Sequence, residues 1–321
     1  MPPPTGRLAP TPSGFLHLGN ARSFLLAWLW ARSAGGRVIM RVEDIDLPRC
    51  RPMFRRQALS DLLWLGLDWD AGPRPDDLPG PFDQSTRFEQ YRLALDQLVQ
   101  AGRAYPCVCS RKDIEEATRA PHGDEGAVYP GTCRGRFATF AEAAEQSGTT
   151  PAWRFAFGDK PISFHDGLQG PVLAHPRDLG DFVLWRKDGL PSYQIAVTVD
   201  DAAMGISQVL RGKDLLLSTA RQLALYEALG LKAPTQWAHV PLLLSQDARR
   251  LAKRDGDLSL KTLRDQGVAP ARMLGLCAYS CGLLGELRQA TLGELTQGFN
   301  LSRLGQADFT LTQEHLAWLL G

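Results

Sequence analysis

One segment near the start of the chain, residues 7–20, combines residue types that could bind a phosphate group. Prolines and glycines end a short apolar strand there, and an apolar helical pattern begins at Ala21. His17, Gly19 and Asn20 therefore lie at a predicted helix N-terminus, where free backbone N–H groups and the helix dipole favour an anion. Gly19 has no Cβ to keep a ligand away, and the two polar side chains can donate hydrogen bonds to phosphate oxygens. The alternative is an ordinary strand–helix turn with an incidental histidine.

A basic segment over residues 249–256 follows a predicted strand at 239–244. Lys253 and Arg254 lie in this segment and could neutralise negative charge on a phosphate. A solvated basic face is the alternative, since most runs of charge have that origin.

Other charged and polar side chains could select a substrate. Arg7 and Arg211 each present a guanidinium, which binds a carboxylate through two parallel hydrogen bonds. Glu43 opens an acidic run over residues 43–46, which is either a solvated turn or a set of carboxylates for a metal. Tyr193 is either an aromatic core residue or a hydroxyl that faces a pocket.

Three cysteines have the spacing of a metal site. Cys107 and Cys109 stand at alternate positions and Cys133 follows after a loop, so the three thiols could converge on a tetrahedral zinc. His122 and Tyr129 are the nearby candidates for a fourth ligand, and on general chemistry the histidine is the better donor. The alternative is three buried, reduced thiols. The remaining cysteines, Cys50, Cys277 and Cys281, are predicted to be core residues.

The elements that must position these residues predict an α/β fold. Strand, helix and strand follow one another from residue 7 to residue 42, which is a βαβ unit and implies a parallel sheet. Ligands bind such sheets beyond the carboxyl ends of the strands, where both the 10–20 loop and the acidic run begin. The chain has neither a G-x-G-x-x-G fingerprint after a strand nor a G-x-x-x-x-G-K-[ST] loop, which argues against a dinucleotide dehydrogenase and a P-loop kinase.

A change in composition after residue 102 and the order of the predicted elements divide the chain into four segments. They are the first half of a catalytic domain (1–104), an inserted α+β domain that carries the zinc candidates (105–186), the second half of the catalytic domain (187–257) and a helical segment (258–321). In the third segment we expect the sheet to resume over residues 191–201 and a helix to follow over 215–229.

The composition excludes several classes of protein. The 321 residues carry 36 Lys and Arg against 35 Asp and Glu, so any nucleic-acid contact must come from a local patch. We identify no apolar run that could span a bilayer and no signal peptide. The cysteines are clustered and not spread as a disulfide framework. We therefore expect a cytoplasmic protein without a membrane partner.

Several of these motifs together resemble the class I aminoacyl-tRNA synthetases, and most closely their glutamyl branch. Residues 7–19 match the pattern R-x-A-P-[ST]-P-[ST]-G-x-L-H-x-G, while Asn20 replaces the second histidine of the signature. Residues 41–46 resemble R-[IV]-E-D-[IT]-D, residues 191–201 resemble P-[ST]-Y-x-[LF]-A-x-V-V-D-D, and residues 249–254 resemble the second signature in its K-L-S-K-R form. In that last segment Arg250 and Ala252 depart from the pattern.

Two features resemble the queuosine-directed members of this branch. These members have a C-x-C … Y-x-x-x-C set, which the spacing of Tyr129 and Cys133 matches. They also have an apolar residue where Val197 stands and where the usual glutamyl enzymes have Asn. The resemblance thus implies Tyr129 as the fourth zinc ligand, with His122 kept as the alternative.

The resemblance implies a Rossmann-like catalytic domain, a tRNA-contacting insertion that holds Zn²⁺, and no anticodon-binding domain. It implies that ATP and Mg²⁺ convert L-glutamate to glutamyl-adenylate, and that the glutamyl group passes to queuosine in the anticodon loop of tRNA(Asp). Two arginines, one Glu and one Tyr complement the two carboxylates and one ammonium of glutamate. We expect a monomer. The alternatives are a truncated glutamyl enzyme that charges a tRNA 3′ end and a catalytically inactive RNA-binding paralogue.

The expected site residues fall into three sets. The glutamate set is Arg7, Leu8, Ala9, Pro10, Thr11, Glu43, Tyr193 and Arg211. The ATP set is His17, Gly19, Asn20, Lys253 and Arg254, of which His17 and Lys253 are expected to stabilise the phosphoryl transition state. The zinc set is Cys107, Cys109, Tyr129 and Cys133.

Overall fold

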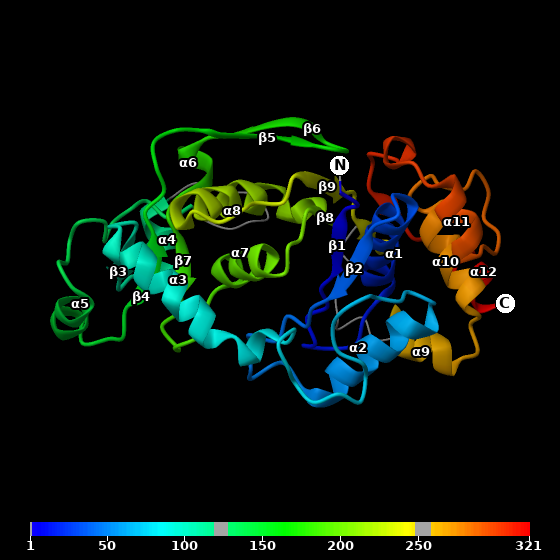
Figure 1. Ribbon diagram of the computed structural model, residues 1–321, viewed down its shortest axis with the longest axis horizontal. Coiled ribbons are helices and arrows are strands. Elements are labelled where there is room, and N and C mark those ends of the chain that lie inside the picture. The colour runs from blue at the N-terminus through cyan, green and yellow to red at the C-terminus, as the bar shows by residue number, and fades with distance from the viewer. Residues whose placement is uncertain (1, 119–127, 248–257) are drawn as a thin grey trace.

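The computed structural model describes residues 2–118, 128–247 and 258–321 (Figure 1). Its centre is a parallel sheet that agrees with the predicted βαβ unit. β1 (Thr5–Leu8) pairs in parallel with β2 (Arg37–Met40), and β8 (Gln208–Gly212) pairs in parallel with β9 (Gln236–Val240). A backbone hydrogen bond from Ser207 to Thr5 joins the two pairs. The carboxyl end of β1 leads into the 10–20 segment, and that of β2 leads into the loop that carries Glu43.

The first helix, α1 (Leu18–Ser33), packs across this sheet because the sequence lets the two backbones approach closely. Both faces of α1 are rich in Leu, Ala and Trp, and Leu25, Leu26 and Leu29 are fully buried. Gly6 of β1 lies under the end of the helix, where a Cβ would be only 3.0 Å from Ala31 Cβ. A larger residue at position 6 would therefore push α1 away from the sheet.

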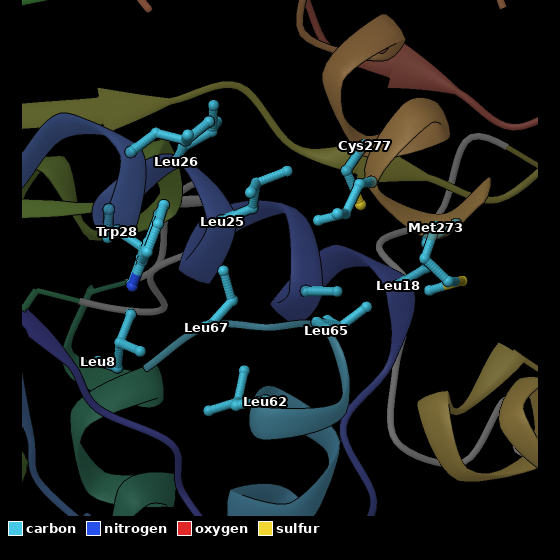
Figure 2. Packing of buried hydrophobic residues seen from close by; sticks show 14 of the residues in the cluster. Leu8, Leu18, Leu25, Leu26, Trp28, Leu62, Leu65, Leu67, Met273 and Cys277 are labelled. Carbon is cyan, nitrogen blue, oxygen red and sulfur yellow. The ribbon is translucent and has the colours of Figure 1, made fainter. Parts of the chain in front are cut away.

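The largest core lies between α1, the next helix along the chain and a helix from the C-terminal part, as Figure 2 shows. Leu62 comes from α2 (Pro52–Trp64), and Met273 comes from α10 (Pro270–Tyr279). Both side chains are fully buried against the same cluster as Leu18 and Leu25 of α1. Apolar burial of this kind contributes roughly 2 kcal/mol for each large side chain, which fixes α1 in place.

Most elements from the middle of the chain lie at one end of the molecule, and the β5–β6 hairpin reaches back from them toward β9 (Figure 1). A three-stranded antiparallel sheet runs in the order β3, β4, β7, and a hairpin of two further strands follows β4 in sequence. The elements are β3 (Ala104–Cys107), α4 (Arg111–Thr118), α5 (Phe140–Ser147), β4 (Ala152–Phe155), β5 (Ile162–Asp166), β6 (Gly170–Ala174), α6 (Pro176–Leu179) and β7 (Phe182–Trp185). This mixture of helices and antiparallel strands agrees with the expected α+β character.

The prediction that the sheet resumes over residues 191–201 is wrong. The segment forms a helix, α7 (Tyr193–Ala203), with Ser192 at its N-cap. Its run of Ile, Val and Thr favours a strand locally, but the helix lies between α3 (Phe88–Gln100) and α8 (Leu216–Leu229), where apolar side chains are buried on more than one face. Tertiary packing therefore overrides the β propensity of the segment.

The C-terminal part of the described chain is mainly helical, as expected. Besides α10 it contains α9 (Leu260–Asp265), α11 (Leu292–Gly298) and α12 (Gln313–Leu320). A short strand, β11 (Phe309–Thr310), pairs in parallel with β10 (Leu243–Leu244) and joins this part to the catalytic half. Within the described residues no helix is both long and apolar enough to cross a membrane.

Candidate active site

A cleft opens at the carboxyl ends of β1, β2 and β8, and many of the residues expected from the sequence line it. Those that do are Arg7, Ala9, Thr11, His17, Gly19, Asn20, Glu43, Tyr193 and Arg211. Leu8 is fully buried behind the cleft, and neither it nor Pro10 lines the wall. The predicted ligands Lys253 and Arg254 lie outside the described residues. Of the described residues on either side of their segment, Leu243 lines the cleft and Ser259 pairs with His17.

His17 and Asn20 form a capping box at the N-terminus of α1. The Asn20 N–H donates to His17 Nδ1 at 3.4 Å, and the His17 N–H donates to Asn20 Oδ1 at 3.1 Å. Because Nδ1 accepts a hydrogen bond, the neutral imidazole carries its proton on Nε2. A Cβ on Gly19 would be 3.1 Å from two atoms of the imidazole, so glycine is what allows the ring to fold over the helix end. Asn20 thus completes the cap.

A buried network of charges behind the cleft joins two predicted site residues, Arg7 and Glu43, to side chains that were not predicted as site residues. Arg41 has no exposed surface and donates to Asp201 and, over 2.9 Å, to Glu43 Oε1. Arg7 Nε lies 3.1 Å from Asp201 Oδ1 on the other side. Burial acts to raise the pKa of Asp201, but the two guanidiniums outweigh it and hold the pKa below its usual range. Asp201 therefore stays ionised and fixes Arg7.

The neighbouring Asp200 is also buried and has partners of its own. Its Oδ1 accepts from Arg87 Nε at 2.7 Å, and its Oδ2 accepts from the Tyr91 hydroxyl and from Gln84 Nε2, each at 2.8 Å. The network therefore contains three acids, which are matched by the three guanidiniums of Arg7, Arg41 and Arg87. The acids are Glu43, Asp200 and Asp201. The wall behind the cleft is thus close to neutral, and Arg211 adds a positive charge on the far side.

Arg211 faces the cleft with one edge of its guanidinium. Its Nε donates to His239 Nε2 at 3.0 Å, and its Nη2 donates to Thr219 Oγ1 at 2.7 Å and to the Leu215 carbonyl. Nη1 donates to the Tyr193 hydroxyl oxygen at 3.2 Å. Since the phenol accepts this bond, its own proton can point toward a ligand, and the two side chains offer a pair of donors to one carboxylate.

The acidic run holds its loop in place. Asp44 accepts hydrogen bonds from the backbone N–H and the hydroxyl of Ser85, at 2.8 and 2.7 Å. Asp46 accepts from Arg49 and lies 3.8 Å from Arg186 at the end of β7. Glu43 differs from these two acids because it lines the cleft, although its side chain is only 9% exposed.

The three cysteines of the predicted zinc set come together in the structure. The Sγ atoms of Cys107, Cys109 and Cys133 all lie within 4.8 Å of one another, and those of Cys109 and Cys133 are 3.5 Å apart. The Tyr129 hydroxyl is 3.4 Å from Cys107 Sγ and 3.8 Å from Cys109 Sγ. Ligand atoms around a tetrahedral zinc are separated by about 3.8 Å for Zn–S bonds of about 2.3 Å, so the four groups fit a zinc ion.

The other cysteine predictions have mixed outcomes. Cys277 and Cys281 are buried core residues, as predicted, whereas Cys50 is only half-buried because it lies in the turn before α2. The alternative zinc ligand His122 lies outside the described residues. Val197 is fully buried in α7.

Comparison with known proteins agrees with this geometry. Residues 5–318 match the family described as tRNA synthetases class I (E and Q), catalytic domain. A relative from Symbiobacterium thermophilum, named glutamyl-Q tRNA(Asp) synthetase, is 50% identical over 98% of each chain. A relative of the same name from Nitratidesulfovibrio vulgaris is 49% identical over 87% of this chain and 86% of its own.

A solved structure gives the same result for the fold. The glutamate–tRNA synthetase from Elizabethkingia anophelis superimposes with a TM-score of 0.82 at 26% identity, covering 98% of this chain and 69% of its own. The resemblance that the motifs predicted is therefore confirmed, and the chain belongs to the class I tRNA synthetases of the glutamyl and glutaminyl group.

Proposed function

We propose that the protein uses ATP to activate L-glutamate as glutamyl-adenylate and then transfers the glutamyl group to queuosine in the anticodon loop of tRNA(Asp). The observation that carries this proposal is one cleft in which two guanidiniums, one carboxylate and one phenol adjoin a helix N-terminus. The names of the relatives from S. thermophilum and N. vulgaris support the same acceptor.

The charges of the cleft are complementary to glutamate. Arg7 and Arg211 pair with its two carboxylates, and Glu43 pairs with its ammonium group. Arg211 Nη1 and the Tyr193 hydroxyl can donate together to the two oxygens of one carboxylate. Ala9 and Thr11 also line this wall. A neutral amide side chain in place of the second carboxylate would leave one guanidinium without its charge partner.

The N-terminus of α1 is suited to the phosphates of ATP, which enters as its Mg²⁺ complex. The dipole of a helix of 16 residues and the Nε2–H of His17 both favour a phosphate there. An oxygen of the glutamate carboxylate attacks the α-phosphorus, and pyrophosphate leaves with the bridging oxygen. We infer that Lys253 and Arg254 neutralise the charge that develops during this step. Catalysis then consists mainly of positioning and electrostatics.

In the second step a hydroxyl oxygen of the acceptor attacks the acyl carbon, and AMP leaves. Queuosine carries a cyclopentenediol whose hydroxyls can accept the acyl group. A single-stranded loop base can be turned out of its stack and read within a cleft, which suits an anticodon-loop acceptor. We infer a cytoplasmic enzyme, since ATP and tRNA are cytoplasmic substrates, and the expectation of a monomer stays a prediction.

Zinc has a structural role in this proposal. Cys107, Cys109, Tyr129 and Cys133 would hold one ion and fix the end of β3 to the loop before α5. Closed sites of four protein ligands stabilise a fold and leave no coordination position for a substrate. Arg154 lies behind the set, because its Nε donates to Cys107 Sγ at 3.2 Å and its guanidinium lies 3.9 Å from the centre of the Tyr129 ring. Its positive charge favours the anionic ligands that zinc requires.

The activation step is tested by ATP–pyrophosphate exchange in the absence of tRNA and in its presence. We expect exchange that depends on L-glutamate and is far weaker with L-aspartate or L-glutamine, because neither places two carboxylates at the spacing of glutamate. Absence of exchange under both conditions would favour the inactive RNA-binding paralogue and overturn the proposal.

A further inference from the structure

A buried acid–histidine pair lies directly behind Arg211. His239 Nδ1 is 2.6 Å from Asp166 Oδ2, and neither side chain has any exposed surface. On the other side of the imidazole, Nε2 accepts the hydrogen bond from Arg211 Nε. The three side chains form a continuous row that ends at the cleft.

The hydrogen bonds define the tautomer of His239. Asp166 Oδ1 accepts from the backbone N–H groups of Leu168 and Gln169, at 3.0 and 2.9 Å, which leaves Oδ2 for the imidazole. A carboxylate only accepts, so the proton of the neutral imidazole lies on Nδ1 and Nε2 keeps its lone pair for Arg211. Burial lowers the pKa of His239, which agrees with a neutral ring.

The backbone around Asp166 is docked firmly on β9. The Gly167 N–H donates to the Trp237 carbonyl at 2.7 Å, and Gln169 Nε2 donates to the His239 carbonyl at 2.8 Å. A Cβ on Gly167 would lie 2.7 Å from a methyl group of Leu301, so the turn is closely packed. Asp166 therefore enters the catalytic half from the β5–β6 hairpin, which the sequence assigns to the insertion.

We propose that Asp166 and His239 are positioning residues for Arg211. Asp166 holds His239 in the tautomer that accepts from Arg211 Nε, and His239 then orients the guanidinium so that Nη1 and the Tyr193 hydroxyl face the substrate carboxylate together. This inference rests on the proposed role of Arg211 in binding glutamate.

Asp166→Asn is the sharpest test because it keeps the size of the side chain and reverses one hydrogen bond. With Oδ1 still accepting from the backbone, the amide nitrogen faces His239 Nδ1 and donates to it. The imidazole proton must then move to Nε2, where it meets the Arg211 Nε–H. Two opposed donors in a buried site displace the guanidinium, so we expect the KM for glutamate to rise roughly tenfold or more. The KM for ATP and kcat should change less than about twofold.

A spectroscopic readout separates this role from a general loss of structure. In ¹⁵N-histidine NMR spectra, His239 of the unchanged protein should carry its proton on Nδ1, and Asp166→Asn should move it to Nε2. Asp159→Asn is the matched control, since Asp159 is exposed in the segment before β5 and should alter neither the tautomer nor the KM. If Asp166→Asn does not fold, His239→Gln, which keeps an acceptor, should retain a lower KM than His239→Leu.

Arg211→Gln distinguishes the two proposals. If it raises the KM for glutamate while the Asp166 and His239 variants do not, the positioning role is refuted and the substrate assignment stands. If Arg211→Gln leaves the KM unchanged, the substrate assignment fails, and the tautomer of His239 still decides whether Asp166 controls the ring.

Discussion

Replacing Glu43 by Gln removes the one negative charge of the protein that we assign to binding the ammonium group of glutamate. Glu43 lines the cleft and accepts from Arg41 Nη2 at 2.9 Å. A glutamine has the same shape and can keep that hydrogen bond through its carbonyl oxygen. The change therefore removes a charge and leaves the packing of the site intact.

The size of the effect follows from the position of this charge. An ammonium about 4 Å from a carboxylate gains roughly 4 kcal/mol at an effective dielectric constant of about 20. Arg41 already engages the same carboxylate, and the cleft is open to water, so the net value should approach that of a charged hydrogen bond, about 2 kcal/mol. We expect the affinity for glutamate to fall roughly thirtyfold.

Glutarate, which lacks the amino group of glutamate but keeps both carboxylates, is the matched ligand. Binding of glutamate and of glutarate is measured by calorimetry on the unchanged protein and on Glu43→Gln. Glutarate should bind the variant as well or better, because the change removes a negative charge that repels its carboxylates. ATP should bind both proteins equally.

An equal loss of affinity for glutamate and glutarate would refute this reasoning. That result would mean that the substitution disturbs the cleft as a whole and that Glu43 does not contact the ammonium group. A loss of ATP binding to the same extent would lead to the same conclusion.

Three further predictions concern the metal, the helix end and the pH dependence of stability. Cys133→Ser should lower the zinc content from about one ion per chain, while Cys50→Ser should not; failure of metal-free protein to bind added zinc would contradict the site. Gly19→Ala should raise the KM for ATP several-fold, because the new Cβ displaces the His17 ring; an unchanged KM in steady-state kinetics would contradict this prediction. Burial raises the pKa of Asp61 to about 6, so the folded state retains a proton that the unfolded chain releases near pH 4. The free energy of unfolding should then fall between about pH 4 and 6, and Asp61→Asn should be more stable at pH 8 by about 2 kcal/mol but not at pH 4; denaturant titrations in which the difference does not change with pH would refute this.

The parts of the fold that the sequence predicted are those with a strong local pattern. The strand, loop and helix around His17 have clear turn residues and a clear apolar period, and the structure agrees with them. The prediction for residues 191–201 was wrong because the β-branched residues there are buried between two helices and do not form a strand. Local pattern cannot distinguish these two origins of an apolar run.

The buried charges were missed for a different reason. Arg41 and Asp201 are separated by 160 positions, and Asp166 and His239 by 73. In the sequence each of these residues looks like any other polar residue, and only the fold brings the partners together. A signal was available for Arg41 and Asp201, since both lie within motifs whose other members line the cleft. No comparable signal in the chain pointed to Asp166.

The identity of the acceptor is tested most directly by locating the transferred glutamate on the tRNA. Radiolabelled glutamate, ATP and the protein are incubated with tRNA(Asp) that carries queuosine and with the same tRNA transcribed without it. Nuclease digestion then locates the label. We predict that it is found on the queuosine nucleoside and that the unmodified tRNA remains unlabelled. Equal labelling of both tRNAs, or label on the 3′ end of tRNA(Glu), would exclude queuosine as the acceptor and establish a glutamyl enzyme that charges the 3′ terminus.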